Sequence, residues 1–325
     1  MSCWFILSAL LSVYNKYIFG KKYFNFQFPL FMTSVNMLWH FLFSYFALDV
    51  LHLISEVNTS TQSWKSYLFY IIPCSVSAGL DIGLSNTSLK FISLTFYTMV
   101  KSSSPIFVLG FSFLFKLERV SIKLIIIIFV ISIGVLLTVL AESEFDSLGF
   151  VLVIISTCLG GLRWCLTQIL VQPVSRHSMH PLIAMRSLSP SMFITLLVVS
   201  LISEGPSTIF GSEYFTSFEN FLLTLGIGLV QGIISFIMVL SEVKLLSLTS
   251  SVTLTIGGIL KEMMMILIST LIFQDKLGPL NIVGFCITIM GILCFNIFRY
   301  LQAKRTEHDG DIMEMTINNG QSGTS

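Results

Sequence analysis

Charged side chains occur inside long stretches of the sequence that are otherwise apolar. Each charge placed in a membrane-spanning helix costs roughly 2.5–3.5 kcal/mol on insertion scales, so each needs a partner or a function. Five of these residues are basic and three are acidic, which leaves two positive charges inside the apolar stretches. An excess of positive charge in a cavity suits an anionic ligand such as a phosphate or a nucleotide. The residues are Lys16, Lys101, Arg163, Arg186 and Lys261, with Asp81, Glu242 and Glu262.

Lys101 has polar neighbours on one face of the helix that we expect around it. Tyr97 and Thr98 precede it by one turn, and Pro105 follows by one turn, where a proline loosens the helix for ligand access. We favour a site in which Lys101 binds an anionic ligand while Tyr97 and Thr98 supply polar contacts. The alternative is an ion pair between Lys101 and Asp81 that holds two helices together.

Lys261 follows small residues on the same helix face. Gly257 and Gly258 lie about one turn earlier and Thr253 lies two turns earlier, which would let a ligand approach the backbone closely. We favour ligand binding by Lys261, and the alternative is tight helix packing with a lysine that extends toward the membrane surface. Glu262 lies about 100° further round the helix. Three roles stay open for Glu262, which could hold a proton, a hydroxyl group or another helix.

Two further cationic positions are candidates for ligand binding. Lys16 ends a stripe with Ser8 and Ser12 at helical spacing, and Asn15 lies beside it. An extension toward the membrane surface explains Lys16 equally well. Arg163 follows a pair of glycines, and its planar guanidinium could bind a phosphate through two parallel hydrogen bonds. A structural ion pair is the equal alternative for Arg163.

The composition excludes several classes of protein. Hydrophobic residues make up 54% of the 325 positions and charged residues make up 11%, where a soluble domain carries roughly 25% charged residues. A net charge of +1 provides no basic surface for a nucleic acid. The five histidines show no metal-ligand spacing, and no catalytic or cofactor-binding motif stands in a suitable context. We therefore expect a chain embedded in a lipid bilayer, with no enzyme activity, metal, cofactor or nucleic-acid partner.

Apolar stretches of about 20 residues, the length that spans a bilayer, indicate ten membrane-spanning helices. The spacing from an acidic residue to a glycine is 16 in both halves, Glu118 to Gly134 and Asp275 to Gly291. Each half has an odd number of spans, five, so the two copies must be inverted in the membrane, as in secondary transporters. We predict an all-α polytopic membrane protein with ten transmembrane helices in two inverted five-helix repeats. The predicted parts are the first repeat at 1–141, the second at 142–301 and a disordered cytosolic tail at 302–325.

The charges of the loops predict the orientation of the spans. With ten spans both termini share a side, and the loops on that side hold nine basic residues against four on the other. Because basic loops stay in the cytosol, we expect both termini to be cytosolic. The spans lie near 3–20, 29–54, 66–89, 93–115, 121–141, 147–172, 181–204, 217–247, 250–273 and 278–301.

Several motifs along the chain resemble those of a known family. They are Asn15-Lys16, Phe28-Pro29, Ser85–Leu89, Tyr97–Ser103 with Pro105, Gly149-Phe150, Leu162-Arg163, Thr167-Gln168, Ser251–Thr255, Gly258, Lys261, Asn281–Gly284 and Gly291. Over about residues 10–300 the chain resembles the triose-phosphate translocators and their nucleotide-sugar relatives, solute carrier family 35 of the drug/metabolite transporter superfamily. It is most similar to the C branch, which holds the Golgi GDP-fucose transporter and a close relative of it. Within that branch the chain resembles the close relative in particular, in the stretches Leu80–Asn86, Leu117-Glu118 and Gly160–Gln168.

The resemblance implies a fold, an activity and a set of site residues. The fold is the ten-helix drug/metabolite transporter fold, also called EamA-like. The activity is antiport, in which a nucleotide sugar enters an organelle lumen while a nucleoside monophosphate leaves it. The implied location is a Golgi or ER–Golgi intermediate membrane. Lys101 and Lys261 match family lysines that bind the phosphate part of the substrate.

Three departures from the family pattern bear on the substrate. Glu262 stands where sugar-phosphate translocators carry an arginine, and an acid there would repel a terminal phosphate dianion, which argues against plastid-type triose-phosphate exchange. Asn36 stands where the translocators carry a histidine. The motif that ends at Lys261 lacks the asparagine that GDP-mannose carriers have before the lysine, so it does not imply guanine recognition.

The residues and the resemblance together lead to one main hypothesis and two alternatives. We predict a secondary antiporter that exchanges a nucleotide sugar, GDP-fucose-like by resemblance, for a nucleoside monophosphate. The two halves would rock about a central cavity, and the substrate would bind between them. The alternatives are a regulator of glycosylation that keeps the transporter fold without transporting, and a carrier of another phosphorylated anion. The sequence is compatible with a homodimer and does not specify the sugar or the base.

Overall fold

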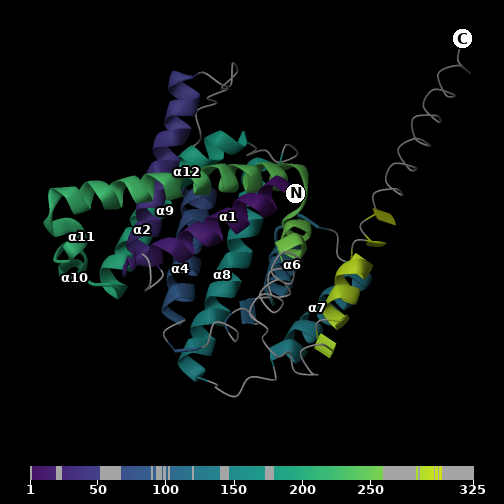
Figure 1. Ribbon diagram of the computed structural model, residues 1–325. Helices are drawn as coiled ribbons and strands as arrows, with labels where there is room; N and C mark the ends of the chain where they lie inside the picture. The colour runs from purple at the N-terminus through teal and green to yellow at the C-terminus, as the bar shows by residue number, and fades with distance from the viewer. Residues whose placement is uncertain are drawn as a thin grey trace, which may run out of the picture. The chain divides into compact units, whose positions relative to one another are not determined.

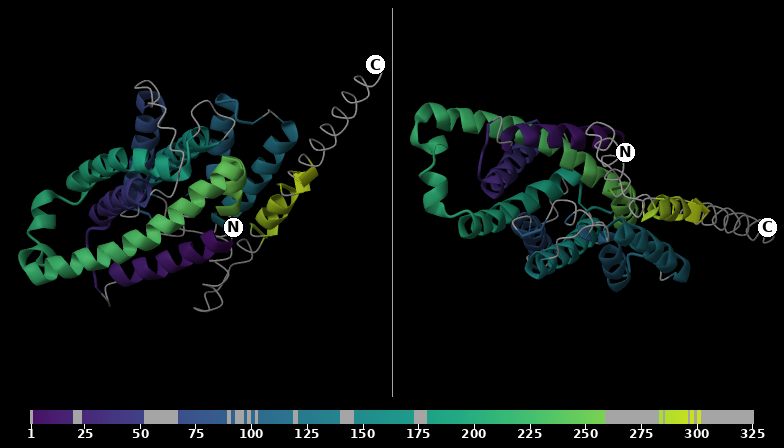
Figure 2. Two further views of the ribbon diagram at one scale, coloured as in Figure 1. Left: turned by 90° about the horizontal axis from the view of Figure 1, so that it is seen from above. Right: turned by 60° about the horizontal axis from the view of Figure 1, so that its bottom comes forward.

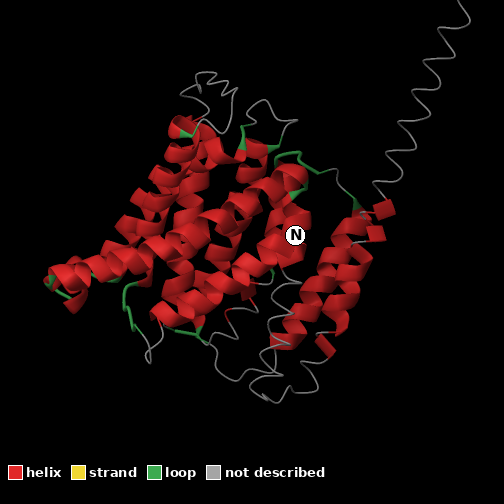
Figure 3. Ribbon diagram, turned by 45° about the horizontal axis from the view of Figure 1, so that its top comes forward, coloured by secondary structure: helices red, strands yellow, loops and turns green. Residues whose placement is uncertain are grey.

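The computed structural model contains helices joined by loops and turns in the part of the chain that it describes. Every regular element among the described residues is a helix (Figure 3), as the all-α prediction requires. The described residues are 2–19, 24–51, 67–88, 91–92, 97, 100–101, 103–118, 121–139, 146–172, 179–258, 283–284, 286–295, 297–298 and 300–301.

Four helices are long and apolar enough to cross a bilayer, and each coincides with a predicted span. They are Tyr67–Ser88, Ser147–Val171, Pro181–Ser203 and Phe218–Leu248. Four shorter apolar helices also fall within predicted spans. They are Trp4–Phe19, Ser104–Leu114, Ile122–Gly134 and Cys286–Phe295. The count of ten spans stays a prediction, because most of the predicted span 250–273 lies outside the described residues.

Large apolar side chains cover the outer faces of these helices. Ile202, Phe218 and Ile122 are 81%, 76% and 74% exposed. A protein in water rarely exposes so much contiguous apolar surface, whereas a bilayer covers it. Together with the long apolar helices, this surface identifies a membrane protein that crosses the bilayer more than once.

Contacts between Cα atoms divide the chain into two compact units. The first unit contains residues 1–118 and 142–261, and the second contains 119–141 and 262–325. The first unit therefore draws helices from both of the predicted repeats. The repeat boundaries themselves stay a prediction.

The first unit holds most of the described helices (Figure 1). They are α1 (Ser2–Phe19), α2 (Pro29–Tyr45) with the π-helical turn η1 (Phe46–Val50), η2 (Tyr67–Ile71) leading into α4 (Ile72–Ser88), α6 (Ser104–Leu114), α8 (Ser147–Val171), α9 (Pro181–Ser203), α10 (Pro206–Phe210), α11 (Glu213–Thr216) and α12 (Phe218–Leu248). One further helix covers 251–258.

Local signals set where several of these helices begin. α2 and α9 start at Pro29 and Pro181, because proline suits the first turn of a helix. Asp146 caps α8 by accepting a hydrogen bond from the amide of Gly149 at 2.8 Å. His180 caps α9 in the same way. Burial, with a smaller effect from the charge of Lys244, lowers the pKa of His180, so its ring stays neutral and can accept this hydrogen bond.

The helices of the first unit pack in pairs that are distant in sequence. α2 packs on α9, α4 packs on α8 and α9, and α12 packs on α1 and α2. The purple α1 runs alongside the green α12 in both views of Figure 2. A Cβ atom at Gly79 would lie 2.6 Å from Thr195 Cγ2, so a glycine on α4 allows the close approach of α9.

Polar interactions stabilise the packing of α2 on α9 at both ends of the contact. Asp49 and Arg186 form an ion pair at 2.6 Å at one end, where both side chains are well exposed. At the other end, the carboxylate of Glu204 meets the start of α2. Near that end Ile18, Phe26 and Ile209 form a buried cluster against α10 and α11.

The second unit contains α7 (Ile122–Val139) and a helical segment within 283–301. A Cβ atom at Gly134 would lie 2.6 Å from Thr288 Oγ1, and one at Gly291 would lie 2.6 Å from Ile131 Cγ1. The two glycines at equivalent positions of the predicted repeats therefore lie at one helix–helix contact. Each of them faces the helix that carries the other.

Candidate functional site

Three charged residues meet between α4, α8 and the residues that precede α6. Lys101 Nζ donates a hydrogen bond to Asp81 Oδ1, forming an ion pair, and a second one to Ser156 Oγ at 2.8 Å. Arg163 Nε lies 3.9 Å from Asp81 Oδ2. We refer to Asp81, Lys101 and Arg163 as the charged cluster. One carboxylate faces two cations in this cluster, which leaves one formal positive charge.

Helical spacing on α4 and α8 builds the charged cluster. Asp81 and Ser85 lie one turn apart on α4, while Ser156, Gly160 and Arg163 share a face of α8. The hydroxyl groups of Ser85 and Ser156 are hydrogen-bonded at 2.9 Å. A Cβ atom at Gly160 would lie 2.9 Å from Asp81 Oδ2, which is too close for normal packing. A glycine at this position therefore makes room for the carboxylate.

The charged cluster bears on both interpretations of Lys101. Its ion pair with Asp81 is present, as the structural alternative requires. The side chains of Lys101 and Arg163 are nevertheless 21% and 27% exposed, against 10% for Asp81. Both cations therefore keep a surface that a ligand can reach. The two interpretations of Lys101 are compatible with each other.

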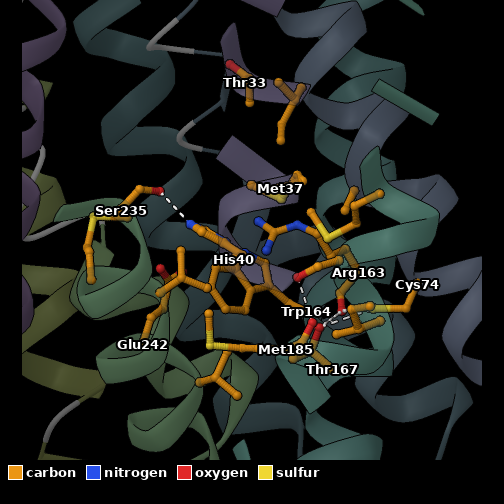
Figure 4. Close-up of a pocket in the computed structure, with 18 residues that line it drawn as sticks. Thr33, Met37, His40, Cys74, Arg163, Trp164, Thr167, Met185, Ser235 and Glu242 are labelled. Carbon is orange, nitrogen blue, oxygen red and sulfur yellow. Dashed lines mark hydrogen bonds between the residues drawn. The ribbon is translucent and has the colours of Figure 1, made fainter. Parts of the chain in front are cut away.

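A pocket of about 290 Å³ lies beside Arg163, among α2, α4, α8, α9 and α12. Its polar lining includes Thr33, His40, Arg163, Ser235 and Glu242 (Figure 4). Its apolar lining includes Trp164 and four methionines, Met37, Met185, Met192 and Met238. A largely apolar wall with a few polar groups is typical of small-molecule sites, and methionine side chains adapt to ligands of different shape.

Arg163 belongs to both the charged cluster and the pocket. Its guanidinium carbon lies 4.3 Å from the centre of the Trp164 ring, in a cation–π contact. Figure 4 shows the side chain reaching from α8 toward His40. Glu242 on α12 brings a negative charge to the wall of the same pocket. The arrangement can accept a molecule with an anionic group near Arg163 and a larger uncharged body against the methionines.

Sequence reasoning did not include His40 or Glu242 among the site residues. His40 is buried, and its Nε2 lies 3.1 Å from Ser235 Oγ on α12. A single histidine in an apolar helix has no spacing partner that would mark it as functional. A usable signal was the helical spacing of Thr33, Met37 and His40, which share one face of α2.

The structure places Asn15 at the contact between α1 and α12. Its Oδ1 accepts a hydrogen bond from Gln231 Nε2 at 2.7 Å. Asn15 therefore links two helices in this structure. Lys16 follows it on α1, but its side chain lies outside the described part of the chain.

The predicted residues near Lys261 are described in part. Thr253 Oγ1 and Ser250 Oγ are hydrogen-bonded at 3.0 Å at the start of the helix 251–258. Gln168 on α8 accepts a hydrogen bond from the Ser251 amide at 2.8 Å, which fixes the start of this helix. Gly257 and Gly258 lie at its end. Like the side chain of Lys16, the residues Thr98, Lys261 and Glu262 lie outside the described part of the chain. Tyr97 is described and half-buried.

Among the predicted site residues that the structure describes, two come together. Arg163 lines the pocket, and Lys101 joins Arg163 through Asp81. Apolar spans that cross a bilayer, with a charged cluster beside a pocket, are an arrangement typical of membrane transporters.

Comparison with known protein families shows to which family of transporters the chain belongs. The chain belongs to the Triose-phosphate Transporter family, whose sequence model matches residues 1–296. This result confirms the predicted resemblance to the triose-phosphate translocators and the prediction of a transporter rather than an enzyme.

Individual relatives agree with the family assignment. A protein of Arabidopsis thaliana named "Probable sugar phosphate/phosphate translocator At1g06470" is 38% identical, over 91% of this chain and 72% of its own length. A protein of Saccharomyces cerevisiae named "Putative nucleotide-sugar transporter YMD8" is 28% identical, over 92% of this chain and 83% of its own length. A solved structure described as "Crystal structure of protein" matches with a TM-score of 0.59 at 14% identity, covering 92% of this chain and 96% of the other. That likeness supports the fold alone.

Proposed function

We propose that the protein is a secondary carrier of a phosphorylated sugar compound and that its charged cluster binds the phosphate. The observation that carries the proposal is the pair of cations, Lys101 and Arg163, that share one buried carboxylate beside an internal pocket. Hydrogen bonds between cationic side chains and a phosphate are strong, and the arginine fork suits a phosphate in particular. The names of the plant and yeast relatives point to the same substrate class.

Within this class we propose a nucleotide sugar as the cargo, GDP-fucose-like by family resemblance. Trp164 and the methionines offer an apolar wall to the uncharged part of a large substrate, and Glu242 can accept hydrogen bonds from sugar hydroxyls or a base. The proposed site also includes Lys261, for which the sequence favours phosphate binding. It further includes the smaller contributors Asn15, Lys16, Tyr97, Thr98, Thr253, Gly257, Gly258 and Glu262.

We propose that transport is antiport against a nucleoside monophosphate in a Golgi or ER–Golgi intermediate membrane, with both termini cytosolic. Positive charge inside the membrane supports exchange, because an empty carrier would move with that charge incompletely compensated. The orientation rests on the basic residues of the loops.

We also propose that the fold is a pair of inverted five-helix repeats with ten membrane spans. The acid-to-glycine spacing first pointed to the repeat. The packing of Gly134 and Gly291 at one helix contact supports it, because an inverted repeat brings equivalent helices together about its symmetry axis.

A second candidate function is exchange of a sugar phosphate for inorganic phosphate. The name of the plant relative, which is 38% identical, favours it. The cations of the charged cluster would serve either cargo. The two candidates differ in the size of the uncharged part and in the counter-substrate.

A transport assay with purified protein in liposomes separates these candidates. Vesicles are preloaded with a nucleoside monophosphate, with inorganic phosphate or with buffer, and are then offered labelled nucleotide sugars or sugar phosphates. We expect uptake of a nucleotide sugar that depends on a preloaded nucleoside monophosphate. Uptake of sugar phosphates against phosphate would instead support the second candidate. The absence of any uptake would contradict both and favour a regulator that does not transport.

A further inference from the structure

The carboxylate of Asp81 lies between Lys101 and Arg163, the two cations to which the proposed function assigns phosphate binding. One oxygen pairs with Lys101, and the other lies 3.9 Å from Arg163. Asp81 thus engages both cations to which the proposed function assigns phosphate binding. A carboxylate and a phosphate present similar oxygen atoms to lysine and arginine.

The surroundings of Asp81 hold its carboxylate in this position. Ser85 Oγ lies 3.5 Å from Asp81 Oδ1. Lys101, which pairs with Asp81, also donates a hydrogen bond to Ser156 Oγ at 2.8 Å. The absence of a side chain at Gly160 leaves the space that Asp81 Oδ2 fills, since a Cβ atom there would lie 2.9 Å away. The longer distance to Arg163 leaves that cation less tightly held than Lys101.

We propose that Asp81 is an internal anion that occupies the phosphate-binding cations of the empty carrier and that the phosphate of the cargo displaces it. This inference rests on the proposed function and assigns to Asp81 the role of a competitor at the phosphate-binding cations. Asp81 would stabilise the empty site and would compete with every anionic ligand. A ligand must then bind the two cations more strongly than the carboxylate of Asp81 does. A phosphate can do so because it has more oxygen atoms and more negative charge than one carboxylate.

Loss of the Asp81 charge should have opposite effects on ligand binding if Asp81 competes with the ligand and if it positions the cations for the ligand. If Asp81 competes with the ligand, Asp81→Asn should bind a phosphate probe more tightly, because the competitor has lost its charge. If Asp81 instead holds the cations in place for the ligand, the same variant should bind the probe more weakly. Removal of an ion-pair partner lowers stability in either case, so a melting temperature alone does not separate the two roles.

The experiment measures equilibrium binding of labelled pyrophosphate to the purified full-length protein in detergent. We expect Asp81→Asn to lower the dissociation constant about 10-fold or more, which is the range for loss of one charged hydrogen bond. The matched control is Asp49→Asn, which removes a carboxylate from the exposed pair with Arg186. The control should leave the dissociation constant unchanged.

A second variant keeps the inference testable if Asp81→Asn does not fold. Gly160→Ala retains the carboxylate but places a methyl group 2.9 Å from Asp81 Oδ2, and we expect this contact to displace the carboxylate from its position between the two cations. It should tighten pyrophosphate binding to a smaller degree. Gly110→Ala is its control, because a Cβ atom at Gly110 meets no atom within 4 Å.

The outcomes distinguish failure of the inference from failure of the proposed function. Tighter binding by Asp81→Asn, or by Gly160→Ala where the first variant does not fold, supports the displaced anion. If wild type binds pyrophosphate and the folded variants bind it equally or more weakly than wild type, the proposed role of Asp81 is overturned. The carrier proposal then stays intact. No pyrophosphate binding by wild type, Asp81→Asn and Gly160→Ala would contradict phosphate binding at this site and, with it, the inference.

Discussion

The carboxylate of Glu204 accepts a hydrogen bond from the amide of Leu30 at 2.8 Å, although the two residues are 174 positions apart. Its second oxygen accepts a hydrogen bond from the Phe31 amide at 3.0 Å. These amides belong to the first turn of α2, where Phe28 provides no side-chain cap. The end of α9 therefore caps the start of α2, and the negative charge suits the positive end of the helix dipole.

Loss of this cap should destabilise the protein. Glu204→Ala leaves two amides of α2 without an acceptor, and we expect the free energy of unfolding to fall by about 1–2 kcal/mol. Thermal unfolding in detergent measures the change. Glu219→Ala, which removes an exposed carboxylate at the start of α12, should have a clearly smaller effect. Equal melting temperatures for the two variants would show that the contact of Glu204 with α2 contributes little.

The geometry of Arg163 predicts that a positive charge alone at this position does not suffice to bind a phosphate tightly. Arg163→Lys keeps one positive charge but loses the planar fork and the stacking on Trp164. We expect the dissociation constant for pyrophosphate to rise about 10-fold. Arg186→Lys makes the same exchange in the exposed pair with Asp49 and should bind as wild type does. Unchanged binding by Arg163→Lys would mean that the phosphate needs a nearby charge rather than the fork.

The pocket and the charged cluster should be separable by substitution. Met238 lines the pocket on α12, and Met238→Trp adds bulk that fills the space proposed for the uncharged body. Nucleotide-sugar exchange in liposomes should be lost, whereas pyrophosphate binding should persist. Met290→Trp is the control, because Met290 is 59% exposed on a helix of the second unit. If Met238→Trp transports normally, the pocket does not hold the cargo.

A side chain added at Gly134 or Gly291 should disturb the contact between the two helices of the second unit that carry these glycines. A Cβ atom at Gly134 or Gly291 would lie 2.6 Å from an atom of the facing helix. We expect Gly134→Ala and Gly291→Ala to cost about 1–3 kcal/mol each, as overpacking does. Gly110→Ala, which meets open space, should not destabilise the protein. Melting temperatures measure the difference, and a stable Gly134→Ala or Gly291→Ala variant would contradict the close contact.

The sequence predicts the helices well where local signals are strong. The expected spans at 29, 147 and 181 begin at the residues where α2, α8 and α9 begin. Pro29, Asp146 and Pro181 fix these starts through backbone geometry and capping, which depend on neighbouring residues alone. The short helices α10 and α11 were not predicted. Helices of five and four residues are too short to show a periodic pattern.

The site was predicted in part, because the sequence does not say which helices face each other. Lys101 and Arg163 were recognised as charges that need a reason to lie in the membrane. Their common partner Asp81 was considered for Lys101 alone, since a bond across 20 positions depends on how α4 packs against the chain before α6. His40 and Glu242 come together through the packing of α2 on α12, which no spacing within one helix reveals.

Lys101 and Arg163 should be required for transport, because we propose that they bind the phosphate of the transported compound. The most direct measurement is exchange of labelled substrate by wild type, Lys101→Gln, Arg163→Gln and the control Arg186→Gln in liposomes, with equal amounts of folded protein. We expect exchange to be lost in the first two variants and to be retained in Arg186→Gln. Exchange at the wild-type rate by both Lys101→Gln and Arg163→Gln would contradict the claim.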